Sequence, residues 1–168
     1  PRPESEDLIS LFLELTASEI AEKVLIDVGA GSGCLGITAK LERSNLSVIL
    51  SDISKPALNI AEKNANALNA DVYIQQQSLL NGQLRPVDYI FANLPYVDKN
   101  WDVSPELQYE PDIALFAEDE GLKLILQLIS QAPRCLTPEG LLFIEADPQQ
   151  HNRIIDEAVK NGFVKERV

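Results

Sequence analysis

The chain alternates between short continuous runs of apolar residues and longer segments in which apolar residues recur every three or four positions. The runs predict five buried strands, at 24–28, 48–50, 72–74, 87–92 and 140–146. The longer segments predict helices at 4–17, 33–42, 54–68, 121–132 and 148–160, with a long loop at 97–117 and a sixth strand from Phe163 onward. Ser54 is expected to cap the third helix. This alternation predicts an α/β fold around a mostly parallel central sheet.

Length and composition favour one folded domain. The 168 residues are 45% apolar and 24% charged, which is ordinary for a globular protein and excludes wholesale disorder. No apolar run approaches the roughly 20 residues of a membrane-spanning helix, and the N-terminus does not read as a signal peptide. Two cysteines and one histidine are too few for a disulfide framework or a zinc site. We therefore expect a cytoplasmic protein without a structural metal.

The charge balance bears on possible partners. The chain carries 26 acidic and 14 basic residues, a net charge of −12. Proteins that bind nucleic acid nonspecifically present a basic face or stripe, whereas the basic residues here are scattered. The balance therefore argues against tight, nonspecific binding of nucleic acid.

A glycine-rich segment follows the first predicted strand, where parallel α/β sheets bind ligands. Glycines let the backbone turn sharply and approach a ligand closely, and the next helix presents its N-terminus. Residues 31–36 spell the dinucleotide pattern GxGxxG. Residues 27–33 also resemble the Asp-x-Gly-x-Gly-x-Gly loop of class I S-adenosylmethionine methyltransferases. The methyltransferase interpretation is favoured because its pattern begins inside the strand, at Asp27. The GxGxxG pattern begins three residues after the end of the strand, whereas a dinucleotide fingerprint starts immediately after it.

Two further groups follow predicted strands. Asp52 ends the second strand, about 20 residues after the glycine loop, where a carboxylate can bind ribose hydroxyls. Residues 93–96, Asn-Leu-Pro-Tyr, follow the fourth strand and resemble the (Asn/Asp/Ser)-Pro-Pro-Tyr motif of methyltransferases that modify planar nitrogens. A neutral amide nitrogen is a poor nucleophile, so two hydrogen-bond acceptors that hold its N–H groups would direct it toward a methyl carbon. The side-chain oxygen of Asn93 and the backbone carbonyl of Leu94 can be those acceptors, and Tyr96 can stack on the planar group.

Nearly the whole chain resembles the HemK/PrmC family, the protein-(glutamine-N5) methyltransferases of peptide-chain release factors. Besides the glycine loop, Asp52 and 93–96, the resemblance includes 2–6 (Arg-Pro-Glu-Ser-Glu), 109–111 (Tyr-Glu-Pro), 114–115, 121–122, 138–140 and Glu145 ahead of Gln150. The resemblance implies the three-layer, Rossmann-like fold of class I methyltransferases. It also implies S-adenosyl-L-methionine as cofactor, S-adenosyl-L-homocysteine as product, and a release factor with its Gly-Gly-Gln loop as substrate.

The resemblance also assigns roles to individual residues. Catalytic roles fall on Asn93, Leu94, Pro95 and Tyr96. Cofactor contacts fall on Asp27, Gly29, Ala30, Gly31, Gly33, Asp52, Ile53, Ser78, Leu79 and Asn93. Substrate contacts fall on Arg2, Asn93, Pro95, Tyr96, Glu110 and Pro111. No metal ligand is implied.

The chain departs from the family pattern in three respects. Leu94 replaces a proline, which preserves the proposed role because that role uses a backbone carbonyl. Ser78 stands where the family usually has an aspartate that contacts the adenine amine. The family's N-terminal helical domain and final strand are expected to be missing, so we expect one catalytic domain, 1–168, with residues 1–20 leading into it and the sheet truncated at its end.

Three other functions compete with glutamine methylation. An adenine-N6 methyltransferase of nucleic acid would use the same motif at 93–96, and Asn-Leu-Pro-Tyr also occurs in rRNA adenine dimethylases. A domain that binds the cofactor with little turnover would explain Ser78. A nicotinamide dehydrogenase would leave residues 93–96 without a role. Net charge and the Tyr-Glu-Pro segment favour a protein substrate over nucleic acid.

Overall fold

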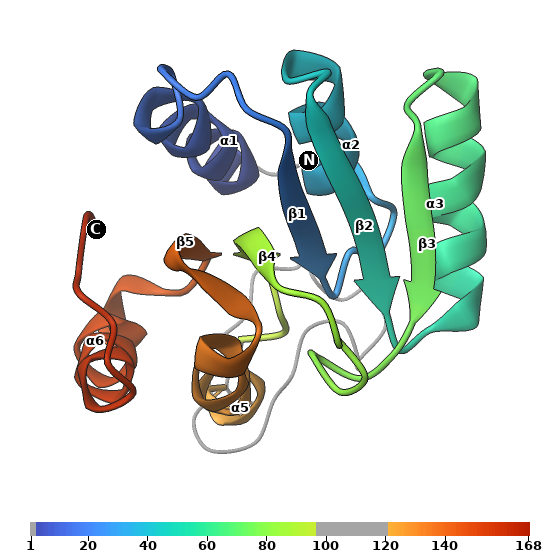
Figure 1. Ribbon diagram of the computed structural model, residues 1–168. Coiled ribbons are helices and arrows are strands. Elements are labelled where there is room, and N and C mark those ends of the chain that lie inside the picture. The colour runs from blue at the N-terminus through green and yellow to red at the C-terminus, as the bar shows by residue number, and fades with distance from the viewer. Residues whose placement is uncertain (1–2, 97–120) are drawn as a thin grey trace. The chain divides into compact units, whose positions relative to one another are not determined.

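The computed structural model describes residues 3–96 and 121–168 of the chain (Figure 1). It divides into two compact units. The first, which we call the sheet unit, comprises Pro1–Asn93 and Arg134–Glu145; the second unit comprises Leu94–Pro133 and Ala146–Val168. None of the helices among the described residues has the length and apolar surface needed to cross a membrane.

The sheet unit contains five strands in the order β3-β2-β1-β4-β5. They are β1 (Lys23–Val28), β2 (Leu46–Asp52), β3 (Val72–Gln76), β4 (Val87–Ala92) and β5 (Leu136–Ile144). Every neighbouring pair is parallel, which confirms the predicted α/β class (Figure 1). The chain builds the sheet outward from β1 to β3, then returns to the other side of β1 for β4 and β5. This reversal makes the carboxyl ends of β1 and β4 the point where such sheets bind ligands.

Three helices of the sheet unit share one apolar core with the strands: α1 (Pro3–Leu15), α2 (Cys34–Glu42) and α3 (Lys55–Ala67). Phe12 of α1 is fully buried and meets the rings of Tyr89, Phe91 and Phe143 edge to face, with centroids 5.1–5.8 Å apart. Such geometry suits the ring quadrupoles and stabilises beyond simple burial. The Ser54 hydroxyl accepts a hydrogen bond from Ala57 N at 3.3 Å, so Ser54 caps α3 as predicted.

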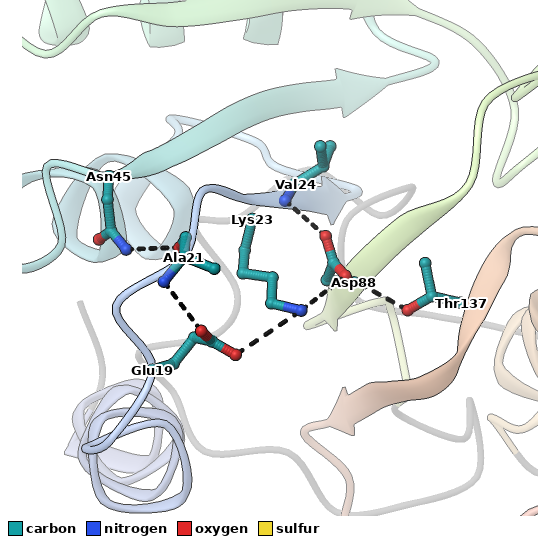
Figure 2. Close-up of polar contacts among 7 residues, drawn as sticks. All are labelled: Glu19, Ala21, Lys23, Val24, Asn45, Asp88 and Thr137. Atoms are coloured by element: carbon teal, nitrogen blue, oxygen red, sulfur yellow. Dashed lines mark hydrogen bonds and ion pairs between the residues drawn. The ribbon is translucent and has the colours of Figure 1, made fainter.

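The amino ends of three strands are joined through one carboxylate, Asp88 (Figure 2). Its oxygens accept hydrogen bonds from the backbone N of Val24 at 2.9 Å and from the Thr137 hydroxyl at 3.3 Å. Lys23 Nζ lies 3.3 Å from Asp88 and 3.6 Å from Glu19. Asp88 therefore ties β1, β4 and β5 together at the end of the sheet opposite the predicted ligand site.

The second unit contains α5 (Lys123–Gln131) and α6 (His151–Lys160), which pack against each other. A 3₁₀ turn, Pro148–Gln150, leads into α6. Asp147 and Gln150 form a reciprocal capping box at this turn: Asp147 accepts from Gln149 N at 2.9 Å, and Gln150 Oε1 accepts from Asp147 N at 3.3 Å.

The structure corrects two predicted strands. β5 spans Leu136–Ile144 rather than 140–146. It begins early because Leu136 pairs with Val87, and an irregularity in the pairing between Val87 and Tyr89 accommodates the segment that contains a proline. Proline is tolerated there because β5 is an edge strand. The sixth strand expected from Phe163 is wrong: residues 163–168 have no regular secondary structure. A strand needs a neighbouring strand to satisfy its backbone hydrogen-bonding groups. Val164 and Val168 are exposed, so burial of their side chains does not favour a strand in this segment. The loop predicted at 97–117 lies outside the described residues.

Candidate active site

The parallel register of the sheet unit brings four residues into one row. Val28 of β1 pairs with Ser51 of β2 and Ala92 of β4, and Ala92 pairs with Ile144 of β5. The residues that come next along these strands are Gly29, Asp52, Asn93 and Glu145. Neighbours on adjacent parallel strands are about 5 Å apart. The row therefore places the glycine loop beside Asp52 on one side and beside Asn93 on the other.

The glycine loop is held by backbone hydrogen bonds of its own. Gly29 N and Ala30 N both donate to Ser51 O, at 2.8 and 3.0 Å, and Gly33 N donates to Ala30 O at 2.7 Å. Gly31 has φ +56°, and a Cβ at that position would meet no atom of the described residues within 4 Å. These backbone hydrogen bonds shape the loop, and Gly31 leaves its backbone open to a ligand.

Asp52 is half-buried at the end of β2 and accepts hydrogen bonds from two backbone amides. Its Oδ2 accepts from Gly31 N at 2.9 Å, and its Oδ1 accepts from Ser54 N at 2.7 Å. A carboxylate offers about four lone-pair positions, so two remain for ribose hydroxyls. The next residue, Ile53, is 61% exposed, an apolar surface directly beside this carboxylate.

Asp27 lies behind the glycine loop rather than on its surface. Its side chain is buried, and its Oδ2 accepts a hydrogen bond from Gly36 N of α2 at 2.9 Å. Burial raises the pKa of Asp27 to about 7, the charge of Asp52 adds to the increase, and the hydrogen bond from Gly36 opposes it. A Cβ on Gly36 would collide with Leu50. Asp27 and Gly36 together hold the first turn of α2 tightly against β1 and β2.

The end of β3 carries the two remaining predicted cofactor residues. Ser78 is exposed, whereas Leu79 is buried and has φ +49°. Gln77 stabilises this turn, because its Nε2 donates to Leu79 O at 2.9 Å and its backbone N donates to Asp52 O at 3.1 Å. Sequence reasoning missed this role of Gln77. The one signal that could have found it was its position just after a strand.

Asn93 contacts a carboxylate from the neighbouring strand end. Its Nδ2 donates to Glu145 Oε2 at 2.8 Å. The backbone N of Glu145 donates to Ala92 O at 2.9 Å, and Glu145 is 8% exposed. Glu145 appeared in the sequence only as a weak family match, and the contact with Asn93 joins residues 52 positions apart.

The rest of the Asn-Leu-Pro-Tyr motif belongs to the second unit. Leu94 is buried, and Pro95 and Tyr96 are partly exposed. Tyr96 O accepts a hydrogen bond from Gln150 Nε2 at 2.7 Å. Gly121 has φ +80°, and a Cβ there would collide with Tyr96 O. Gly121 and Gln150 therefore hold the backbone at the end of the motif.

Of the predicted substrate residues, Arg2, Glu110 and Pro111 lie outside the described residues.

The chain matches known methyltransferases along most of its length. Residues 7–108 match the family Methyltransferase small domain. A release factor glutamine methyltransferase from Lactococcus lactis is 36% identical over 153 residues, which cover 89% of this chain and 56% of that protein. The one from Deinococcus radiodurans is 33% identical over 168 residues, covering 99% and 60%. The chain thus spans less than two thirds of the length of these curated relatives.

Solved structures show the same architecture. The ribosomal protein L11 methylase from Lactobacillus delbrueckii subsp. bulgaricus superposes with a TM-score of 0.70 and 27% identity, covering 100% of this chain and 75% of that one. These matches confirm the resemblance found in the sequence. They agree with the site itself, in which an open glycine loop, a carboxylate and the Asn-Leu-Pro-Tyr motif follow β1, β2 and β4. The chain belongs to the methyltransferase small domain family.

Proposed function

We propose that this protein is an S-adenosylmethionine-dependent methyltransferase that modifies the side-chain amide nitrogen of a glutamine in a peptide-chain release factor. The observation that carries the proposal is the pairing of Val28 with Ala92, which sets Gly29 of the glycine loop beside Asn93. An amide acceptor thereby adjoins the loop that binds the methyl donor. The curated relatives, each described as a release factor glutamine methyltransferase, support this choice of substrate.

The residues of the sheet unit fit S-adenosylmethionine. Gly31 opens backbone to the ligand, and the N-terminus of α2 follows the loop, where a carboxylate is favoured. Asp52 retains lone pairs for the ribose hydroxyls, and the exposed side chain of Ile53 offers apolar surface for the adenine. Ser78 offers a hydroxyl where the family usually has an aspartate. When bound, the cofactor supplies an electrophilic methyl group on its sulfonium.

Within this proposal the chain acts by positioning. An amide lone pair is delocalised into its carbonyl, so the nitrogen needs to be held in line with the methyl carbon. Asn93 Oδ1 and the carbonyl of Leu94 accept the two N–H groups of the substrate amide, and Tyr96 stacks on its plane. No strong base is needed before attack, because the nitrogen becomes acidic once methylated and then releases its proton to water.

Two features favour a protein over nucleic acid as acceptor. A net charge of −12 opposes contact with phosphates. Residues 109–111, outside the described residues, resemble the Tyr-Glu-Pro segment of the glutamine methyltransferases. Because release factors act during translation, we propose the cytoplasm as the location of the protein.

The test uses the full-length protein with methyl-labelled cofactor and two acceptors offered together, a release factor containing Gly-Gly-Gln and total RNA. We expect label on the glutamine of the factor, located by mass spectrometry of its peptides. Asn93→Ala is the matched control and should retain cofactor binding but transfer no methyl group. Label located on adenine N6 of the RNA would establish the rival activity instead, and cofactor binding without transfer to any acceptor would indicate a binding domain.

A further inference from the structure

The amide of Asn93 has two ends of nearly equal shape and opposite hydrogen-bonding character. A half-turn about the Cβ–Cγ bond exchanges Oδ1, an acceptor, with Nδ2, a donor. Only the first orientation suits a substrate amide, whose nitrogen presents N–H groups. The proposed chemistry therefore requires something in the protein that distinguishes the two ends.

Glu145 contacts one end of this amide. Asn93 Nδ2 donates to Glu145 Oε2 at 2.8 Å, a distance typical of a strong, charge-assisted hydrogen bond. A carboxylate only accepts, so it pairs with Nδ2 and repels Oδ1. Glu145 is itself held in place, because it is buried and its backbone N donates to Ala92 O at 2.9 Å.

We propose that Glu145 is a positioning residue that fixes the orientation of the Asn93 amide, so that Oδ1 is the end presented to the substrate amide. This inference rests on the proposed function. Glu145 does not contact the reacting atoms; it acts through Asn93. Ile144 of β5 pairs with Ala92 of β4, so the residues that follow these two strand ends, Glu145 and Asn93, lie side by side.

The proposal predicts a particular pattern among three variants. In Glu145→Gln the new side chain can face Asn93 with either end, so the orientation is no longer imposed and kcat should fall about two- to tenfold. In Asn93→Asp two carboxylates face each other, and kcat should fall further. In the double variant the introduced glutamine amide donates to one oxygen of the introduced aspartate while the other oxygen faces the substrate, so kcat should rise about fivefold or more above Asn93→Asp.

The measurements are kcat and KM on a Gly-Gly-Gln peptide, cofactor affinity by calorimetry, and the thermal midpoint of each variant. Glu139→Gln, an exposed carboxylate on the same strand, is the matched control and should leave kcat unchanged. The Asn93 side-chain N–H signals, assigned by NMR in ¹⁵N-labelled protein, report the contact independently of activity. They should be protected from hydrogen exchange in the wild type and lose protection in Glu145→Gln.

Two results would overturn the proposal: wild-type kcat in Glu145→Gln, or a double variant no more active than Asn93→Asp. A purely structural role for Glu145 would lower the thermal midpoint without this pattern of rescue. Failure of the proposed function looks different, because the wild-type protein itself would then transfer no methyl group to the peptide.

Discussion

The Asp27 carboxyl is buried behind the glycine loop, so its ionisation should make the stability of the protein depend on pH. Burial raises the pKa of this group from 3.8 to about 7, and the charge of Asp52 contributes in the same direction. Each pH unit between the two values corresponds to about 1.4 kcal/mol. The difference of about three units therefore amounts to about 4 kcal/mol in the free energy of unfolding.

The direction of the effect follows from proton binding. The unfolded chain releases this proton near pH 3.8, whereas the folded protein retains it until about pH 7. Between these values the folded state binds more protons than the unfolded state, so the free energy of unfolding falls as the pH rises. The contribution of Asp27 to the free energy of unfolding is complete below pH 3.8 and is lost once the pH has risen through about 7.

Asp27→Asn should remove this dependence. Asparagine stays neutral and keeps an oxygen that can accept the hydrogen bond from Gly36 N. Between pH 5 and pH 8 the variant should gain about 3 kcal/mol relative to the wild type. Urea unfolding at several pH values measures the difference, with Asp71→Asn, at an exposed position, as the control. An equal difference at pH 5 and pH 8 would refute the reasoning.

Three further predictions concern the candidate site. Asp52→Ala should weaken cofactor binding about tenfold or more through lost charge-assisted hydrogen bonds, and equal affinity by calorimetry would count against the ribose assignment. Leu94→Pro should keep at least about half of the wild-type kcat, since the proposed contact is a backbone carbonyl; an inactive but folded variant would contradict this. Gly121→Ala should destabilise by more than about 1 kcal/mol beyond Gly162→Ala in urea unfolding, because both glycines have positive φ but only at Gly121 would the Cβ strike Tyr96 O; equal losses would show that φ strain alone matters.

Much of the fold was predictable because it depends on local pattern. The apolar run at 87–92 matches β4 residue for residue, and Ser54 caps α3 as its residue type suggests. The glycine loop and Asp52 could be placed from their positions after predicted strands, since parallel sheets gather those ends on one side. The single domain and the individual roles of the site residues stay predictions.

Sequence alone thus determined the class of fold and the family, and it predicted the segments of the candidate site, because periodicity, caps and motifs each involve residues close together in the chain. The tertiary structure decided which distant residues meet. Register between β4 and β5 brings Glu145 to Asn93, and the turn before α6 brings Gln150 to Tyr96. Packing of α2 on β1 buries Asp27 and raises its pKa. Pairing also decided the strands themselves, since β5 starts where Val87 offers a partner and residues 163–168 form no strand. Contacts of this kind depend on strand order and burial, which no local pattern encodes.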